Sequence, residues 1–237
     1  MGQGIGTTMT QIVCETLDLD SSKVKWMKPD TKLTPDAGTS TASRQTVFTG
    51  EATRNAAMEI KKQLDAGKTL ADLEGEEFYG EYSSVTDRMG SDKKNPISHV
   101  AYGYATQVVI LDENGKLEKV IAAHDIGRAI NPINVEGQIE GGVVMSLGYA
   151  LTETYPLDNC VPKAKYGTLG LFKATDAPKI ETIIIEKNKA GLAYGAKGIG
   201  EITAIPTAPA VQNAYYRFDG EFRTSLPLEN TSYRKKK

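Results

Sequence analysis

Two glycine-rich loops stand out as places that could bind an anion. Residues 2–6 read Gly-Gln-Gly-Ile-Gly and residues 195–200 read Gly-Ala-Lys-Gly-Ile-Gly, and each precedes a predicted helix. A loop that leads into a helix presents unpaired backbone N–H groups and the positive end of the helix dipole. Neither loop matches a known nucleotide fingerprint, since the first lacks the third Rossmann glycine and the second lacks the Gly-Lys-Ser/Thr ending of a P-loop. The alternative is that these glycines serve only turns and helix packing.

A run of small hydroxyl residues lies ahead of a long predicted helix. Residues 38–46 read Gly-Thr-Ser-Thr-Ala-Ser-Arg-Gln-Thr and hold five hydroxyl side chains. Capping a helix requires only one or two of them. Two interpretations stay open: a capped helix with a soluble first turn, or a cradle of hydroxyl, amide and backbone donors around a polar ligand.

Glu201 is the candidate general base. It follows the second glycine loop and precedes Ile202, Ala204 and Ile205. A carboxylate among glycines and apolar residues is expected to be partly desolvated, which suits a base. The alternative is an acid that interacts with the positive end of a helix dipole.

The remaining residues with reactive side chains have less support from their surroundings. His124 and Asp125 are adjacent in a predicted strand, so they point to opposite faces and cannot act as a base and its orienting partner. Cys14 and Cys160 are interpreted as packing residues rather than nucleophiles. No metal ligands are predicted on this chain, because it holds only two histidines and two cysteines.

The elements that must position these residues are a mixture of helices and strands. Apolar residues at helical spacing predict helices over residues 7–17, 43–64, 69–73 and 135–151, and from 203 to 216. Alternating or β-branched segments predict strands over residues 22–28, 78–85, 101–111, 117–124 and 180–185. Asn114-Gly115 favours a tight hairpin turn, and Asn131-Pro132 marks a helix start. Hairpins together with crossovers predict an α+β architecture.

The composition is that of an ordinary globular protein. The chain has 237 residues, 40% of them hydrophobic and 24% charged, with a net charge of −2. That charge argues against a nucleic-acid binder, and apolar runs of only a few residues argue against a membrane span. The length fits one large domain or two small ones, with a polar break near residues 83–98. Few cysteines fit a reducing cytoplasm, where we expect the protein.

The first residues are also unusual for a protein start. After Met1 the chain enters the first glycine loop directly. A native N-terminus usually opens with a dispensable tail or a strand. We therefore expect that a further segment belongs before it, on the same gene or on a partner chain.

Taken together, these motifs resemble one family. Residues 1–4 (Met-Gly-Gln-Gly), 40–45 (Ser-Thr-Ala-Ser-Arg-Gln), 137–141 (Gly-Gln-Ile-Glu-Gly) and 198–201 (Gly-Ile-Gly-Glu) occur in the order and spacing of the molybdenum-binding subunit of the xanthine dehydrogenase and aldehyde oxidase family. The Asn131-Pro132 segment and residues 226–228 (Leu-Pro-Leu) also fit. The resemblance covers essentially residues 1–237 and corresponds to the C-terminal, molybdopterin-binding part of that subunit.

The resemblance implies specific site residues. Gln3 matches the glutamine that contacts the molybdopterin cofactor, Gln138 matches a second glutamine near the pterin and the metal, and Glu201 matches the catalytic base. The segment that wraps the pterin and its phosphates corresponds to Ser40, Thr41, Ala42, Ser43, Arg44, Gln45 and Thr46. Loop residues that complete the implied cofactor site are Gly4, Lys197, Gly198 and Gly200. The metal is held by the pterin dithiolene in this family, so no side-chain ligand is implied.

The resemblance also implies a reaction and partners. The family hydroxylates heteroaromatic rings, such as purines or nicotinate, or aldehydes, with water as the oxygen source and a glutamate as base. In bacteria the cofactor is often the cytosine dinucleotide form. Electrons leave through iron–sulfur clusters and usually a flavin (FAD), which must lie on partner chains. The upstream half of the usual subunit is absent, so the gene is split or this is a fragment, and the chain by itself should not turn over.

A second hypothesis from a different class stays open. The chain could be a non-catalytic binding or assembly module that keeps this fold. Analysis of the purified complex for metal and pterin distinguishes the two hypotheses.

Overall fold

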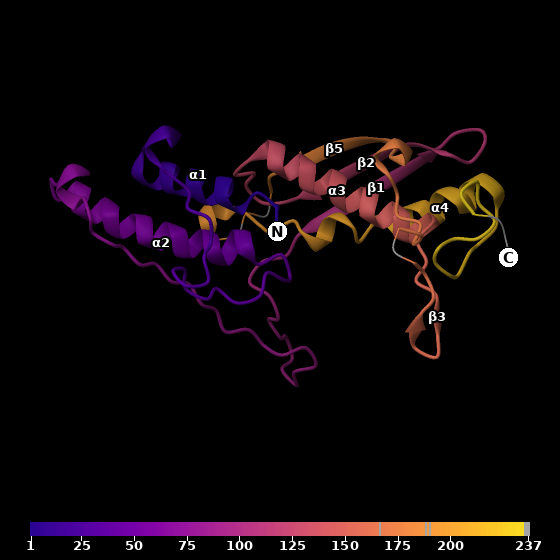
Figure 1. Ribbon diagram of the computed structural model, residues 1–237, viewed down its shortest axis with the longest axis horizontal. Coiled ribbons are helices and arrows are strands. Elements are labelled where there is room, and N and C mark those ends of the chain that lie inside the picture. The colour runs from indigo at the N-terminus through magenta and orange to yellow at the C-terminus, as the bar shows by residue number, and fades with distance from the viewer. Residues whose placement is uncertain (166, 188, 190, 235–237) are drawn as a thin grey trace. The chain divides into compact units, whose positions relative to one another are not determined.

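Figure 1 shows a computed structural model of the chain, which describes residues 1–165, 167–187, 189 and 191–234. The chain forms two compact units that alternate along the sequence. Unit 1 consists of Met1–Gly103, Ile126–Asn134 and Glu186–Gly198. Unit 2 consists of Tyr104–Asp125, Val135–Ile185 and Ile199–Lys237.

Unit 1 is built on two helices, α1 (Ile5–Leu17) and α2 (Gln45–Asp65), which lie side by side in Figure 1. Apolar residues at helical spacing bury one face of each helix. A Cβ on Gly50 of α2 would lie 3.0 Å from Cδ1 of Ile12 on α1, so this glycine lets the helices approach closely. Three short 3₁₀ helices complete the unit: η1 (Ser21–Lys23), η2 (Ala71–Leu73) and η4 (Ala193–Gly195).

Two predicted strands, residues 22–28 and 78–85, are wrong. Among its described residues, unit 1 contains no β-strand, only the isolated bridge between Gly127 and Ala196. Residues 78–85 instead run along α2, where Asn55 Nδ2 donates to the Glu81 carbonyl at 2.9 Å. An alternating pattern fits any extended backbone, and a strand forms only where another strand is available to pair.

Unit 2 contains a three-stranded sheet with strand order β1-β2-β5. The antiparallel strands β1 (Tyr104–Leu111) and β2 (Leu117–Asp125) join through the predicted turn, in which Gly115 has φ +73°. Strand β5 (Lys179–Ile185) runs parallel to β2, so a long crossover that contains α3 (Pro132–Leu151) connects them. A small hairpin of β3 (Leu157–Asp158) and β4 (Val161–Pro162) was not predicted.

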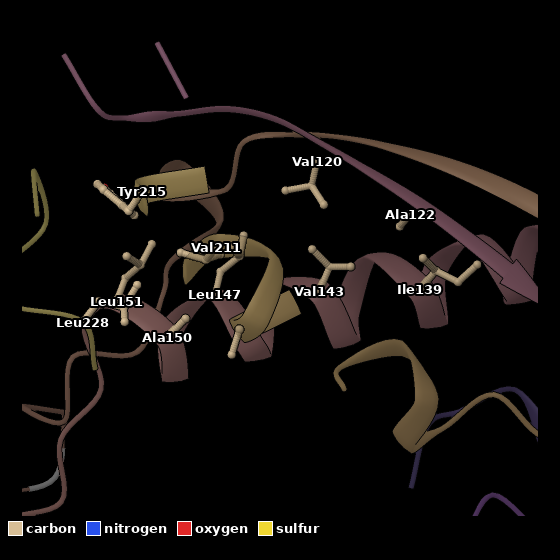
Figure 2. Close-up of a cluster of buried hydrophobic side chains, with 11 residues drawn as sticks. Val120, Ala122, Ile139, Val143, Leu147, Ala150, Leu151, Val211, Tyr215 and Leu228 are labelled. Carbon is tan, nitrogen blue, oxygen red and sulfur yellow. The ribbon is translucent and has the colours of Figure 1, made fainter. Parts of the chain in front are cut away.

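The core of unit 2 lies between the sheet and helices α3 and α4 (Thr207–Asp219), as Figure 2 shows. Val120 and Ala122 of β2 contribute no exposed surface. They meet apolar side chains of the two helices and of the C-terminal segment: Ile139, Val143, Leu147, Ala150, Leu151, Ala208, Val211, Tyr215 and Leu228. Burial of each large apolar side chain stabilises the fold by about 1.5–3 kcal/mol. The α+β class is confirmed.

The other predicted elements appear with shifted ends. Helix α4 begins at Thr207 rather than directly after Thr203, because Glu201–Thr203 form a separate 3₁₀ helix, η5, and Pro206 is the N-cap of α4. Residues 83–98 contain no helix or strand. Over the part of the chain that the structure describes, every helix is too short or too polar to cross a bilayer.

Candidate cofactor-binding site

The first glycine loop opens onto the N-terminus of α1. Gly4 is the N-cap with φ 83°, a left-handed conformation that favours glycine, and no side chain caps this helix end. The Gln3 Oε1 atom is buried and has no hydrogen-bond partner among the described residues. An unpaired buried acceptor costs about 1–3 kcal/mol. The loop therefore fits a polar ligand that supplies a donor to Gln3 and accepts from the helix N-terminus.

Asn134 is a neighbour of this loop that sequence analysis missed. Its Nδ2 is a buried donor for which the described part of the chain offers no partner. A Cβ on Gly4 would lie 2.6 Å from this nitrogen, so the two residues are in direct contact. Asn131 Oδ1 accepts from the Asn134 N–H at 2.9 Å and thereby caps α3. The signal available in the sequence was a second asparagine three positions after Asn131, at the predicted helix start.

The N-cap position of α2 is held by Arg44 rather than by a hydroxyl residue, and the Arg44 side chain makes no capping hydrogen bond. Arg44 Nη1 instead donates to the carbonyls of Ala37 at 3.1 Å and Thr39 at 3.3 Å, which folds the preceding loop back over the helix start. Ala42 and Ser43 both have left-handed backbones, with φ 51° and 52°. Such strained residues persist where contacts hold them, often at ligand clamps.

The second glycine loop touches the hydroxyl segment within unit 1. A Cβ on Gly198 would lie 1.6 Å from the carbonyl oxygen of Ser43. The neighbouring Lys197 is buried, and its backbone N–H donates to the Ile126 carbonyl at 3.0 Å. Lys197 and Arg44 add two cationic side chains to these adjoining segments, and the hydroxyl groups add neutral donors. This donor set suits phosphate groups.

A cavity of about 370 Å³ lies elsewhere in unit 1. It is lined by residues between Gln11 and Ser21, in the C-terminal half of α1 and directly after it, by Arg128 to Ile130, and by Tyr194. It includes none of the residues that the sequence assigns to the cofactor, so the predicted site and this cavity are different places.

The other predicted site residues belong to unit 2. Gln138 lies in the second turn of α3 and is partly buried. Glu201 is exposed as the first residue of η5, so its predicted desolvation within this chain is wrong. Burial in this turn falls on Thr203 instead, whose carbonyl accepts from Gln107 Nε2 at 2.9 Å and whose Oγ1 donates to the Gly200 carbonyl at 2.7 Å. These contacts hold the backbone that carries the Glu201 carboxylate.

His124 also lies in unit 2, where it is a buried structural residue. Its side chain is fully buried, and burial lowers the pKa of its imidazole. Cys14 is partly buried, Cys160 is exposed, and both are free thiols. The described residues bring together no group of three His, Cys, Asp or Glu side chains able to hold a metal ion.

The fold and these loops define a cofactor-binding domain, and comparison with known families identifies it. The family model of the molybdopterin cofactor-binding domain matches residues 1–72 and 65–178. These matches cover more than half of the chain, so the chain belongs to the molybdopterin cofactor-binding domain family. This confirms the family relationship that the motifs predict.

Known members of the family match nearly the whole chain. A putative xanthine dehydrogenase molybdenum-binding subunit of Escherichia coli is 28% identical over 96% of the chain. A 6-hydroxypseudooxynicotine dehydrogenase complex subunit of Paenarthrobacter nicotinovorans is 28% identical over 90%. The crystal structure of an aldehyde oxidoreductase from Desulfovibrio desulfuricans superposes with a TM-score of 0.77 over 91% of the chain, at 26% identity.

The chain is much shorter than these relatives. It spans 35% of the Escherichia coli protein, 32% of the Paenarthrobacter protein and 25% of the aldehyde oxidoreductase chain. Family membership therefore establishes a molybdopterin cofactor-binding domain in this chain. It does not by itself assign the activity of the longer relatives to the chain.

Proposed function

We propose that this chain is the C-terminal part of the catalytic, cofactor-binding subunit of a molybdenum hydroxylase. The contact between Gly198 and Ser43 carries the proposal, because it unites two predicted cofactor segments in one unit. The named activities of the relatives, a putative xanthine dehydrogenase and an aldehyde oxidoreductase, support a heteroaromatic ring or an aldehyde as substrate class. Water supplies the oxygen that enters the product.

The residues of unit 1 bind the cofactor in this proposal. The Gln3 amide pairs with a polar group of the pterin, which satisfies the buried Oε1. Hydroxyl groups of Ser40, Ser43 and Thr46, with the cationic Arg44 and Lys197, hold the phosphates. The family resemblance implies the cytosine dinucleotide form of the cofactor, which we include in the proposal. When bound, the molybdenum cofactor supplies the two-electron redox chemistry.

The family resemblance implies roles for two residues of unit 2. Gln138 orients the cofactor through its side-chain amide. The Glu201 carboxylate accepts a proton as the oxygen nucleophile forms, so it acts as general base. Its exposure in this chain leaves it accessible to a partner polypeptide that would desolvate it and raise its basicity.

The proposal requires further polypeptides. The remaining length of the relatives supports an upstream part of the molybdenum subunit, and the reaction's electrons require an iron–sulfur subunit and an FAD subunit. The substrate is a small molecule, and neither nucleic acid nor a membrane is a partner. We place the assembled complex in the cytoplasm.

Cofactor analysis of the native complex tests the proposal. The tagged chain is purified with its co-purifying subunits. Molybdenum is measured by mass spectrometry and pterin by fluorescence after oxidation, and hydroxylation of purines, nicotinate and aldehydes is assayed. We expect about one molybdenum and one pterin per chain together with turnover of one substrate class. A folded, intact complex with pterin and molybdenum but no turnover would support an assembly module, and a complex with neither would overturn cofactor binding.

A further inference from the structure

Three consecutive left-handed residues precede the Lys197–Gly198 loop. Ala193, Tyr194 and Gly195 have φ values of 45°, 57° and 87°. An L residue adopts this conformation only where surrounding contacts hold it. Apart from Gly195, this turn lies outside the sequence motifs, and its anchors are a feature that only the structure shows.

The first anchor is Glu51, a buried carboxylate on α2. The residue as a whole is 6% exposed. Oε2 accepts from the backbone N–H of Ala193 at 2.7 Å, and Oε1 accepts from Arg54 Nη1 at 2.7 Å. A buried carboxylate is stable only when both of its oxygens accept hydrogen bonds. Here Ala193 donates to one oxygen of Glu51 and Arg54 donates to the other.

The second anchor is the side chain of Tyr194. Its hydroxyl shares a hydrogen bond of 2.9 Å with Thr16 Oγ1 of α1. The guanidinium groups of Arg54 and Arg128 lie 5.4 Å and 5.8 Å from the ring centroid. The Gly195 carbonyl then accepts from the Arg128 N–H at 3.0 Å. The turn is therefore attached to α1, to α2 and to residues 126–128.

These contacts connect the two proposed cofactor segments to each other through α2. Helix α2 begins at Gln45, two residues after Ser43, and carries Glu51 in its second turn. Glu51 holds Ala193, and five residues beyond Ala193 the chain returns to Ser43 through the backbone of Gly198. The position of Gly198 against Ser43 thus depends on a rigid helix, one carboxylate and one strained turn.

We propose that Glu51 is a positioning residue for cofactor binding: its carboxylate sets the Lys197–Gly198 loop in register with the hydroxyl segment at the start of α2. This inference rests on the proposed function, because it assigns these two segments to the cofactor. Glu51 acts through the backbone N–H of Ala193.

The experiment uses substitutions at Glu51 in the native complex. Glu51→Ala removes both acceptors, Glu51→Asp keeps the charge but is one methylene too short, and Glu51→Gln keeps one oxygen for Ala193. Glu59→Ala is the matched control, since Glu59 pairs with Lys62 at the same i, i+3 spacing on the exposed face of α2. Molybdenum and pterin per folded chain are measured alongside the thermal unfolding temperature.

We expect Glu51→Ala and Glu51→Asp to lower cofactor content by about tenfold, the range typical when an outer support of a bound group is removed. Glu51→Gln should recover most of it, and Glu59→Ala should match wild type. If Glu51→Ala does not fold, Glu51→Asp carries the test. Wild-type cofactor content in the folded Glu51→Asp complex, whatever its unfolding temperature, would overturn the positioning role. A wild-type complex without cofactor would instead overturn the proposed function itself.

Discussion

Gly198 and Ser43 are in backbone contact: a Cβ added to Gly198 would lie 1.6 Å from the carbonyl oxygen and 2.6 Å from the carbonyl carbon of Ser43. Both atoms belong to backbone, so neither can rotate away as a side-chain tip could. Only glycine permits this approach, which explains why the second loop needs glycine at this position.

Gly198→Ala should therefore push the two segments apart. We expect a loss of about 1–3 kcal/mol in the free energy of unfolding, as for other overpacked sites. Denaturant titration of the purified chain measures it. Gly191→Ala is the control, because a Cβ at Gly191 meets nothing within 4 Å. Equal stability of the two variants would show that the contact is not tight.

Two adjacent glycines in α3 should respond oppositely to alanine. A Cβ on Gly142 would lie 1.9 Å from Thr203 Oγ1 and 2.6 Å from Thr203 Cβ, whereas Gly141 faces open space. Gly142→Ala should cost about 1–3 kcal/mol by displacing η5. Gly141→Ala should stabilise the helix by up to about 1 kcal/mol. Thermal unfolding compares them, and a stabilised Gly142→Ala would contradict the packing of Thr203.

Glu201→Gln tests the proposed base in the assembled complex. Glutamine is nearly isosteric with glutamate but cannot take up a proton at neutral pH. Turnover should fall by about 10²–10⁴-fold at unchanged molybdenum content. The exposed Glu118→Gln in the same unit should leave turnover unchanged. If Glu201 is only a helix-terminus acid, its variant keeps its rate and loses about 0.3–1 kcal/mol of stability.

Acidification should destabilise the fold through His124. Burial holds the pKa of this imidazole below its ordinary value of 6.5. As the pH falls below 6.5, the unfolded chain binds the proton first, so folding stability decreases until the lowered folded pKa is reached. The slope is at most about 1.4 kcal/mol per pH unit. Denaturant titrations between pH 7 and pH 5, in approximate steps of half a unit, measure the slope.

His124→Gln should remove this part of the pH slope, whatever its effect on stability at neutral pH. His99→Gln at the exposed second histidine is the matched control. An unchanged slope in His124→Gln would mean that other groups cause the acid sensitivity.

The sequence alone determines most helices, the central hairpin and the family. Helix periodicity is local, so α1, α2 and α3 could be predicted to within a few residues. Asn114-Gly115 imposes its turn through backbone preferences that need no distant partner. The motif residues could be recognised because their types and order are readable directly from the chain.

Only the tertiary structure decides which distant groups meet. Residues 78–85 have the local sequence pattern that predicts a strand. They nevertheless lie along α2, because no strand is available beside them. Glu201 has apolar neighbours in sequence but is exposed, because Thr203 takes the buried position. Glu51 and Asn134 have ordinary local contexts, and their roles arise from Ala193 and Gly4, which lie far away along the chain. Burial and hydrogen-bond partners are set by long-range packing, which local pattern does not encode.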